Sequence, residues 1–143
     1  MEKHVSIYVV VVCSLVLALG AAAGAQNSVY YFPHVADGSY IFGSEFWFNN
    51  VQDTATDVTL TFYDEAGAPW VVDLRSYDGG GGQKSTFIFT MQPYSSKFFF
   101  TGCVDPLKVG WAMVETSQPV NVSASFSFYD FYPDPPVVKW SAG

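Results

Sequence analysis

Apolar residues recur at every second position from Val29 onward, which is the period of a β-strand that buries one face. The segment 120–128 separates its faces cleanly, with Val120, Val122, Ala124, Phe126 and Phe128 on one and Asn121, Ser123, Ser125 and Ser127 on the other. No segment shows the sustained spacing of three and four residues that is typical of an amphipathic helix. The pattern therefore predicts an all-β protein with half-buried strands.

Turn-forming residues divide the chain into short alternating segments. These segments predict strands at Val29–Val35, Tyr40–Asn49, Ala55–Tyr63, Trp70–Leu74, Thr86–Met91, Ser96–Phe100, Val109–Glu115 and Val120–Tyr129. Seven or eight short strands predict an antiparallel two-sheet sandwich of the immunoglobulin-like type, with a closed barrel as the alternative. We expect the interior to be filled by Phe46, Phe62, Trp111 and Phe126.

Two segments depart from the alternation. The run Gly79–Gly82 predicts a flexible hairpin loop, because Lys84-Ser85 leads into a strand and not into the helix that a phosphate-binding loop requires. Tyr129–Pro136 is too rich in proline for a central strand and predicts an extended segment. Val137–Trp140 is compatible with a further edge strand. An aromatic, proline-rich tail therefore begins at about residue 129.

The first residues have the pattern of a cleaved signal peptide. Lys3 precedes the apolar run Val9–Leu19, and the small residues of Ala23-Gly24-Ala25 provide a cleavage site. The apolar run is shorter than the about 20 residues that a membrane anchor needs. We therefore predict a signal peptide at 1–25, a single domain at 26–143, no membrane insertion after cleavage, and secretion to an extracellular or periplasmic location.

The chain carries 13 acidic and 6 basic residues, for a formal net charge of -7. One acid, Glu2, and one base, Lys3, lie in the predicted leader, so the mature chain keeps this charge with 12 acids and 5 bases. Nucleic acids and anionic membranes are bound by clustered Lys and Arg, which this balance does not supply. We therefore expect no nucleic-acid partner.

The predicted cleavage reduces the number of cysteines from two to one. Removal of the leader leaves Cys103 as the one cysteine of the mature chain, so no intramolecular disulfide is expected. We favour a role for Cys103 as a small buried apolar residue over a reactive thiol or an intermolecular disulfide.

Catalytic and metal-binding patterns are weak. His34 is the one histidine left after cleavage, and next to Pro33 it is interpreted as a structural or surface residue. No serine lies in the strand-to-helix turn that exposes a catalytic nucleophile. The acidic residues are interpreted as turn-forming carboxylates rather than glycosidase acids. We expect no cofactor, with calcium as a minor alternative, and predict that the protein is not an enzyme.

Four motifs occur along the chain in a fixed order: Tyr31–Gly38, Val58–Pro69, Val109–Ala112 and Gln118–Val120. With these motifs the chain resembles a group of uncharacterised secreted bacterial β-sandwich domains of the immunoglobulin-like kind, from about Tyr30 to Phe128. The resemblance implies a sandwich fold and an extracellular compartment, and the group carries no established catalytic activity. The chain departs from it after Phe128, where the tail replaces a short glycine-rich close.

Aromatic residues make up 18% of the chain, more than a small core requires, and they are the strongest functional lead. By alternation, the outward or irregular positions are Trp47, Trp70, Tyr94, Phe99, Tyr129, Phe131, Tyr132 and Trp140. Exposed rings stack on sugar faces or anchor protein partners. The alternative is that loops and the tail cover both faces of the sandwich. The candidate ligand-binding residues are Tyr129, Phe131, Tyr132 and Trp140.

These observations predict a secreted, non-catalytic binding or structural module that recognises a glycan or a surface protein through exposed aromatics. The alternative is a cell-surface assembly subunit that pairs with a neighbour through an edge strand or through the C-terminal tail. A hydrolase that uses Asp130 and Asp134 is the third candidate.

Overall fold

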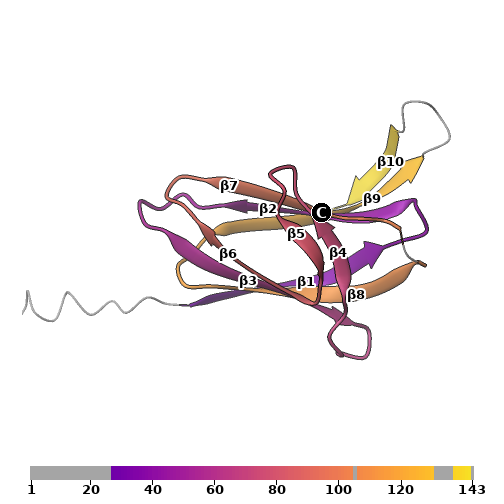
Figure 1. Cartoon of the computed structure of the whole chain (residues 1–143), viewed down its shortest axis with the longest axis horizontal. Helices are drawn as coiled ribbons and strands as arrows, with labels where there is room; N and C mark the ends of the chain where they lie inside the picture. The colour runs from indigo at the N-terminus through magenta and orange to yellow at the C-terminus, as the bar shows by residue number, and fades with distance from the viewer. Residues whose placement is uncertain (1–26, 105, 131–136, 143) are drawn as a thin grey trace, which may run out of the picture.

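The computed structural model describes residues 27–104, 106–130 and 137–142, of which 129–130 and 137–142 are described by their backbone (Figure 1). This part of the chain forms ten strands and no helix. The strands are β1 (Ser28–Asp37), β2 (Phe42–Asn49), β3 (Thr56–Asp64), β4 (Val72–Arg75), β5 (Gly81–Lys84), β6 (Thr86–Met91), β7 (Ser96–Thr101), β8 (Lys108–Thr116), β9 (Asn121–Asp130) and β10 (Val137–Ala142). The predicted leader at 1–25 lies outside the described residues.

The strands form two separate antiparallel sheets. A four-stranded sheet has the order β1-β8-β3-β6, and a six-stranded sheet has the order β10-β9-β2-β7-β4-β5. Figure 1 shows them as two layers, with β2, β7 and β9 in one and β1, β3 and β8 in the other. The all-β, two-sheet prediction is confirmed. The closed barrel is not formed, because no described strand pairs through its backbone with strands of both sheets.

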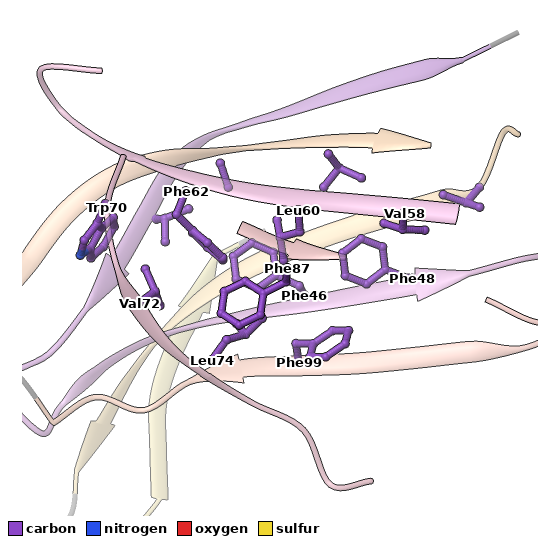
Figure 2. Close-up of a cluster of buried hydrophobic side chains, with 14 of the residues drawn as sticks. Phe46, Phe48, Val58, Leu60, Phe62, Trp70, Val72, Leu74, Phe87 and Phe99 are labelled. Carbon is purple, nitrogen blue, oxygen red and sulfur yellow. The ribbon is translucent and has the colours of Figure 1, made fainter. Parts of the chain in front are cut away.

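The core lies between the sheets, where the apolar faces of the strands meet. β2 contributes Phe46 and Phe48, and β3 contributes Val58, Leu60 and Phe62, all of them fully buried. Figure 2 shows these side chains gathered between the ribbons. The rings of Phe46 and Phe62 meet edge to face with their centroids 5.5 Å apart, a geometry that aromatic pairs prefer. Alternation along both strands therefore places the residues that join the two layers.

The eight strands predicted from alternation are present, with small shifts at their ends. The structure adds β5 and β10, so the count exceeds the predicted seven or eight. β10 confirms that Val137–Trp140 belongs to an edge strand, since β9 is its one partner among the strands that the structure describes. In the part of the chain that the structure describes, no helix is long and apolar enough to cross a membrane.

The glycine run takes part in a hairpin, but its second half is a strand and not a flexible loop. Gly81 and Gly82 begin β5, which pairs with β4. Gly81 has a φ of 115°, and a Cβ at this position would overlap the carbonyl of Leu74. Glycine is therefore required for β5 to approach β4 this closely.

Two aromatic residues that alternation places outward lie in the core. Trp70 is 6% exposed and Phe99 is 4% exposed. Trp70 stands just before β4 and meets the ring of Phe62 edge-on, with the centroids 6.5 Å apart. Phe99 lies in a run of three phenylalanines, in which alternation does not reveal the apolar face, and it pairs with the inward Phe46. The prediction for both residues is wrong because the deciding information is the pairing between strands.

Trp111 shows the opposite error. The sequence predicts it in the interior, but it is half-buried on the outer face of β8. The inward positions of this strand belong to Ala112 and Val114, which are fully buried. The smaller residues fill the interior here, and the indole lies outside.

β1 is interrupted by a register shift against β8 between Phe32 and Val35. Pro33 lies in this gap, where its missing N–H removes a ladder hydrogen bond. The next residue, His34, is exposed, and its ring meets that of Phe126 edge-on at 4.7 Å between centroids. His34 is therefore a surface histidine, as predicted, whereas Phe126 is half-buried rather than a centre of the interior.

Gly110→Ala is expected to destabilise the fold. A Cβ on Gly110 in β8 would overlap the backbone carbonyl of Tyr63 and lie 2.9 Å from the ring of Trp70. Because both neighbours are held by the core, the free energy of unfolding should fall by about 1–3 kcal/mol in a urea titration. Gly80→Ala is the matched control: its nearest neighbour is Asp78 Oδ1 at 3.3 Å, and its cost should stay under about 1 kcal/mol. Equal stability of the two variants would contradict this prediction.

Candidate ligand-binding face

The structure describes the predicted tail residues only in part. Tyr129 lies in β9 opposite Val138, and Trp140 lies in β10 opposite Phe128. The backbone therefore brings the positions of Tyr129 and Trp140 onto adjacent strands. The other two candidate residues, Phe131 and Tyr132, lie outside the described residues.

A second group of aromatics gathers on the outer face of the six-stranded sheet. It consists of Trp47 from β2, Phe98 and Phe100 from β7, and Tyr77 from the β4–β5 turn, and we name these four residues the aromatic platform. Their positions follow from the core. Since Phe46 and Phe48 point inward, Trp47 between them points outward, and the inward Phe99 turns Phe98 and Phe100 outward in the same way.

The rings of the platform form a continuous series. Trp47 and Phe98, which are opposite each other in register, have ring centroids 5.0 Å apart. Tyr77 stacks on Phe98 at 5.8 Å with an interplanar angle of 17°, and Phe98 stacks on Phe100 at 5.8 Å with an angle of 27°. Trp47, Phe98 and Phe100 are half-buried, whereas Tyr77 is 87% exposed. The arrangement offers a broad apolar surface to solvent.

Polar residues border the platform on the β9 side. Ser123 lies opposite Trp47, and Ser125 lies opposite Glu45. The hydroxyl of Ser125 donates a hydrogen bond to Glu45 Oε2 at 3.4 Å. Ser127, which alternation places on the same solvent-facing row, is buried. Two serines and a carboxylate therefore line this border.

A charged border lies beside Phe100. Glu45 of β2 and Arg75 of β4 are its cross-strand partners, one on each side. The guanidinium of Arg75 donates two hydrogen bonds to Asp73 Oδ2, at 2.7 and 3.0 Å. The platform is therefore flanked by groups that can donate to hydroxyl oxygens and accept hydrogen bonds from hydroxyl groups.

The turn that carries Tyr77 is held by the carboxylate of Asp78. Asp78 Oδ1 accepts hydrogen bonds from the hydroxyl of Ser76 at 2.6 Å and from the N–H of Gly80 at 3.2 Å, and Lys97 Nζ donates to Oδ2 at 3.1 Å. These donors, chiefly Ser76 and then Lys97, lower the pKa of Asp78 from 3.8 to about 2. The exposed ring of Tyr77 thus stands on an ordered turn.

The other sheet carries a smaller aromatic row on its outer face. Tyr63 of β3 and Trp111 of β8 are opposite each other and stack with ring centroids 4.2 Å apart at an angle of 16°. Tyr31 of β1 lies 6.4 Å from Trp111 between centroids. This row resembles the aromatic platform in composition but lies on the outer face of the other sheet, so it can serve as a control for the platform.

Cys103 lies in a strained and partly buried corner. Its N–H donates to Asp37 Oδ1 at 2.8 Å, and its carbonyl accepts from the N–H of Tyr40 at 2.7 Å. Cys103, Ser39 and Tyr40 all adopt positive φ values between 56° and 61°. Desolvation by burial, followed by the charge of Asp37, raises the pKa of the thiol from 9.0 to about 11. The predicted inert role of Cys103 fits this environment.

A carboxylate beside one hollow has a structural role. This hollow, of about 790 Å³, is lined in part by Asp64, Glu65 and Lys108. Asp64 Oδ1 accepts hydrogen bonds from the N–H groups of Ala66 and Ala68 at 3.0 and 2.8 Å, which is the turn-forming use predicted from sequence. Among the described residues, no three His, Cys, Asp or Glu side chains cluster as a metal site would require.

Sequence reasoning located part of this face. It placed Trp47 and Tyr94 outward, and Tyr94 is indeed 74% exposed, although it lies outside the platform. It missed Tyr77, because the turn before the glycine run carries no alternation, and it missed Phe98 and Phe100 because of the phenylalanine run. The pairing of β7 with β2 is the information that identifies them.

No protein-family model matches the chain, and no curated protein matches it significantly. Among solved structures, the "Crystal Structure of Thermotoga maritima 1070" is similar, with a TM-score of 0.49 and 16% sequence identity over 84% of this chain and 92% of that chain. At this degree of likeness, nothing about a ligand or an activity follows for this chain.

The carboxyl group of Asp78 should titrate with a midpoint near 2 in carbon-detected NMR. Ser76→Ala removes its strongest hydrogen bond, so the midpoint should rise toward 3.8. The sign follows from the lowered pKa: the ionised carboxylate holds the turn above pH 3.8, and this support is lost as the pH falls through 2. An unchanged midpoint in Ser76→Ala would show that other groups set this pKa.

Cys103 should react slowly with iodoacetamide. With a pKa of about 11 instead of 9.0, the thiolate fraction at about pH 8 is about 100-fold smaller than in the unfolded chain. Alkylation measured by mass spectrometry should therefore be about 100-fold slower in the native protein than in urea. Similar rates in both states would overturn the inert assignment.

Proposed function

We propose that the protein is a non-catalytic binding module that recognises a glycan through the aromatic platform. The observation that carries this proposal is the continuous series of half-exposed rings from Trp47 to Tyr77, bordered by hydrogen-bonding side chains. Sugar rings present apolar C–H faces together with hydroxyl groups. Flat aromatic rings bind the former, and polar neighbours bind the latter.

The shape of the face supports an extended ligand. The platform lies on the surface of a sheet, and its rings follow β2 and β7 and then cross to the β4–β5 turn. A small-molecule site is usually a concave pocket that encloses its ligand. An open row of rings with Ser123 and Arg75 nearby instead suits a chain of sugar units. A net charge of -7 favours a neutral or cationic ligand over a polyanion.

The proposal also includes three features that are predicted from the sequence. They are the immunoglobulin-like type of sandwich, the cleaved leader at 1–25, and secretion to an extracellular or periplasmic location. The leader pattern and the resemblance to secreted domains support them. A glycan-binding module in that compartment meets cell-surface or extracellular polysaccharides directly.

The tail extends the proposed site. Tyr129, Phe131, Tyr132 and Trp140 stay candidate ligand-binding residues, because β9 and β10 belong to the same six-stranded sheet as the platform. Tyr132→Ala and Trp140→Ala test this extension. If they retain glycan binding while Tyr77→Ala loses it, the site is the platform without the tail.

A cell-surface assembly subunit is the second candidate function. The observation that favours it is that β10 (Val137–Ala142) is an edge strand whose one neighbour in the described part of the chain is β9. An exposed edge can accept a strand from another protein. Size-exclusion chromatography of a chain ending at Tyr129 distinguishes the functions, since assembly predicts a loss of oligomers and the platform does not.

The glycan proposal predicts the outcome of a glycan array probed with and without calcium. Trp47→Ala and Tyr77→Ala should each weaken binding by about 10-fold, because each removes a stacking surface from the platform. Tyr31→Ala is the matched control, since it removes a 64% exposed ring from the opposite sheet and should leave binding unchanged. Thermal unfolding checks that all three variants fold.

Loss of binding in Tyr31→Ala with normal binding in Tyr77→Ala would move the site to the other sheet and overturn the platform assignment. A blank array for the wild-type protein would count against the glycan class. A calcium requirement would revive the minor alternative of a bound cation.

A further inference from the structure

Among the described strands, β6 lies at an edge of the four-stranded sheet and pairs with β3 alone. Phe62 N–H donates to the carbonyl of Ser85, just before β6, at 2.8 Å. In an antiparallel strand, successive residues direct their backbone polar groups to opposite sides. Since the backbone groups of Ser85 point toward β3, those of Phe87 and Phe89 do so as well. The N–H and C=O groups of Thr86, Ile88 and Thr90 therefore point away from β3, along the outer edge of the sheet.

This edge has a self-complementary sequence. The segment Thr86–Thr90 reads Thr-Phe-Ile-Phe-Thr, which is the same in both directions. Two antiparallel copies related by a two-fold axis at Ile88 place each Thr86 opposite a Thr90 and each Phe87 opposite a Phe89. An isologous dimer interface requires such a match of a surface with itself.

Two of the other described edge strands, β1 and β5, carry features that discourage pairing, and β6 does not. β1 is interrupted at Pro33, and β5 is a four-residue strand that begins with two glycines at positive φ. β6 has six residues, no proline, no charge and no register shift in its pairing with β3. Its central Ile88 is 77% exposed. Proteins usually protect long apolar edges, so an open one indicates a partner.

A hollow beside β6 also indicates that a second strand can pack along this edge. It has a volume of about 310 Å³ and is lined by Phe87, Ile88 and Phe89 of β6, by Phe99 and Lys97 of β7, and by Lys84, Asp78 and the glycine turn. A second strand laid along the edge would lie over this hollow. Its inward phenylalanines would pack beside Phe87 and Phe89, on the core side of the sheet.

We propose that the protein forms a two-fold symmetric homodimer by antiparallel pairing of β6 with β6 of a second copy. The pairing joins two four-stranded sheets into one continuous eight-stranded sheet, with about six new backbone hydrogen bonds from Thr86, Ile88 and Thr90 of the two chains. This proposal is independent of the glycan proposal, since no residue of the platform lies in β6. A single short strand forms a small interface, so the dimer dissociates on dilution.

Sedimentation velocity over a wide range of protein concentration tests the dimer. The wild-type protein should shift from monomer to dimer as its concentration rises, without any glycan present. Ile88→Lys sets two like charges opposite each other on the two-fold axis, so the dimer Kd should rise by about 100-fold or more. Because Ile88 is exposed in the monomer, this variant should unfold at the wild-type temperature.

Val29→Lys is the matched control. Val29 is 46% exposed and lies on β1, the other edge of the same sheet, so this variant should dimerise like the wild type. A wild-type protein that stays monomeric, or an Ile88→Lys variant that dimerises normally, would overturn the proposal. Loss of the dimer in Val29→Lys with a normal dimer in Ile88→Lys would place the contact on β1 and overturn it as well.

Cross-linking fixes the register. In a Cys103→Ser background, Ile88→Cys should give a covalent dimer with a short bis-maleimide, because the two residues 88 are opposite each other. Val29→Cys should not. Efficient cross-linking through residue 29, with none through residue 88, would contradict the β6 pairing even if a dimer exists.

Discussion

The contact between Phe46 and Phe62 is the constraint on which the rest of the molecule depends. One ring comes from each sheet, and both are fully buried where they meet edge to face. Because side chains alternate along a strand, placing these two residues inward decides the direction of every other side chain on β2 and β3. Trp47 and Tyr63 are turned outward for this reason. The aromatic surfaces of both layers are therefore consequences of how the core is packed.

The sequence predicts the direction of a side chain correctly where alternation alone decides which face of the strand is buried. Strands with a clear apolar face, such as Val58–Phe62, could be placed from alternation because burial of one face is visible in the residues themselves. β5 could not be placed from the sequence, because it begins with two glycines, which have no side chain to reveal a buried face. Phe98–Phe100 and Trp70 were ambiguous because their direction depends on strand pairing and on the turn into β4, which are tertiary facts. The platform was hidden for that reason, and only its Trp47 was accessible.

The two sheets are also joined by a polar contact at the β1–β2 corner. Ser44 of β2 donates its hydroxyl to the carbonyl of Ala36 in β1 at 2.9 Å and accepts the N–H of the same residue at 3.0 Å. Its own N–H donates to Thr101 Oγ1 at 3.0 Å. These groups are buried, and leaving any of them unpaired would cost about 1–3 kcal/mol. The corner that contains Asp37 and Cys103 is thus fixed by hydrogen bonds as well as by apolar contacts.

The strand order determines when each strand can pair during synthesis of the chain. Among the described strands, β1 pairs only with β8, and β2 pairs with β7 and β9. Both early strands therefore pair with residues more than forty positions later in the chain. Distant pairing of this kind slows folding, because long loops must close before their contacts form. During synthesis, the N-terminal half has no native partner to pair with. The pairings of β1 and β2 therefore form only after β7 to β9 have been made, whereas the β3–β6 and β4–β5 pairings are complete within residues 56–91.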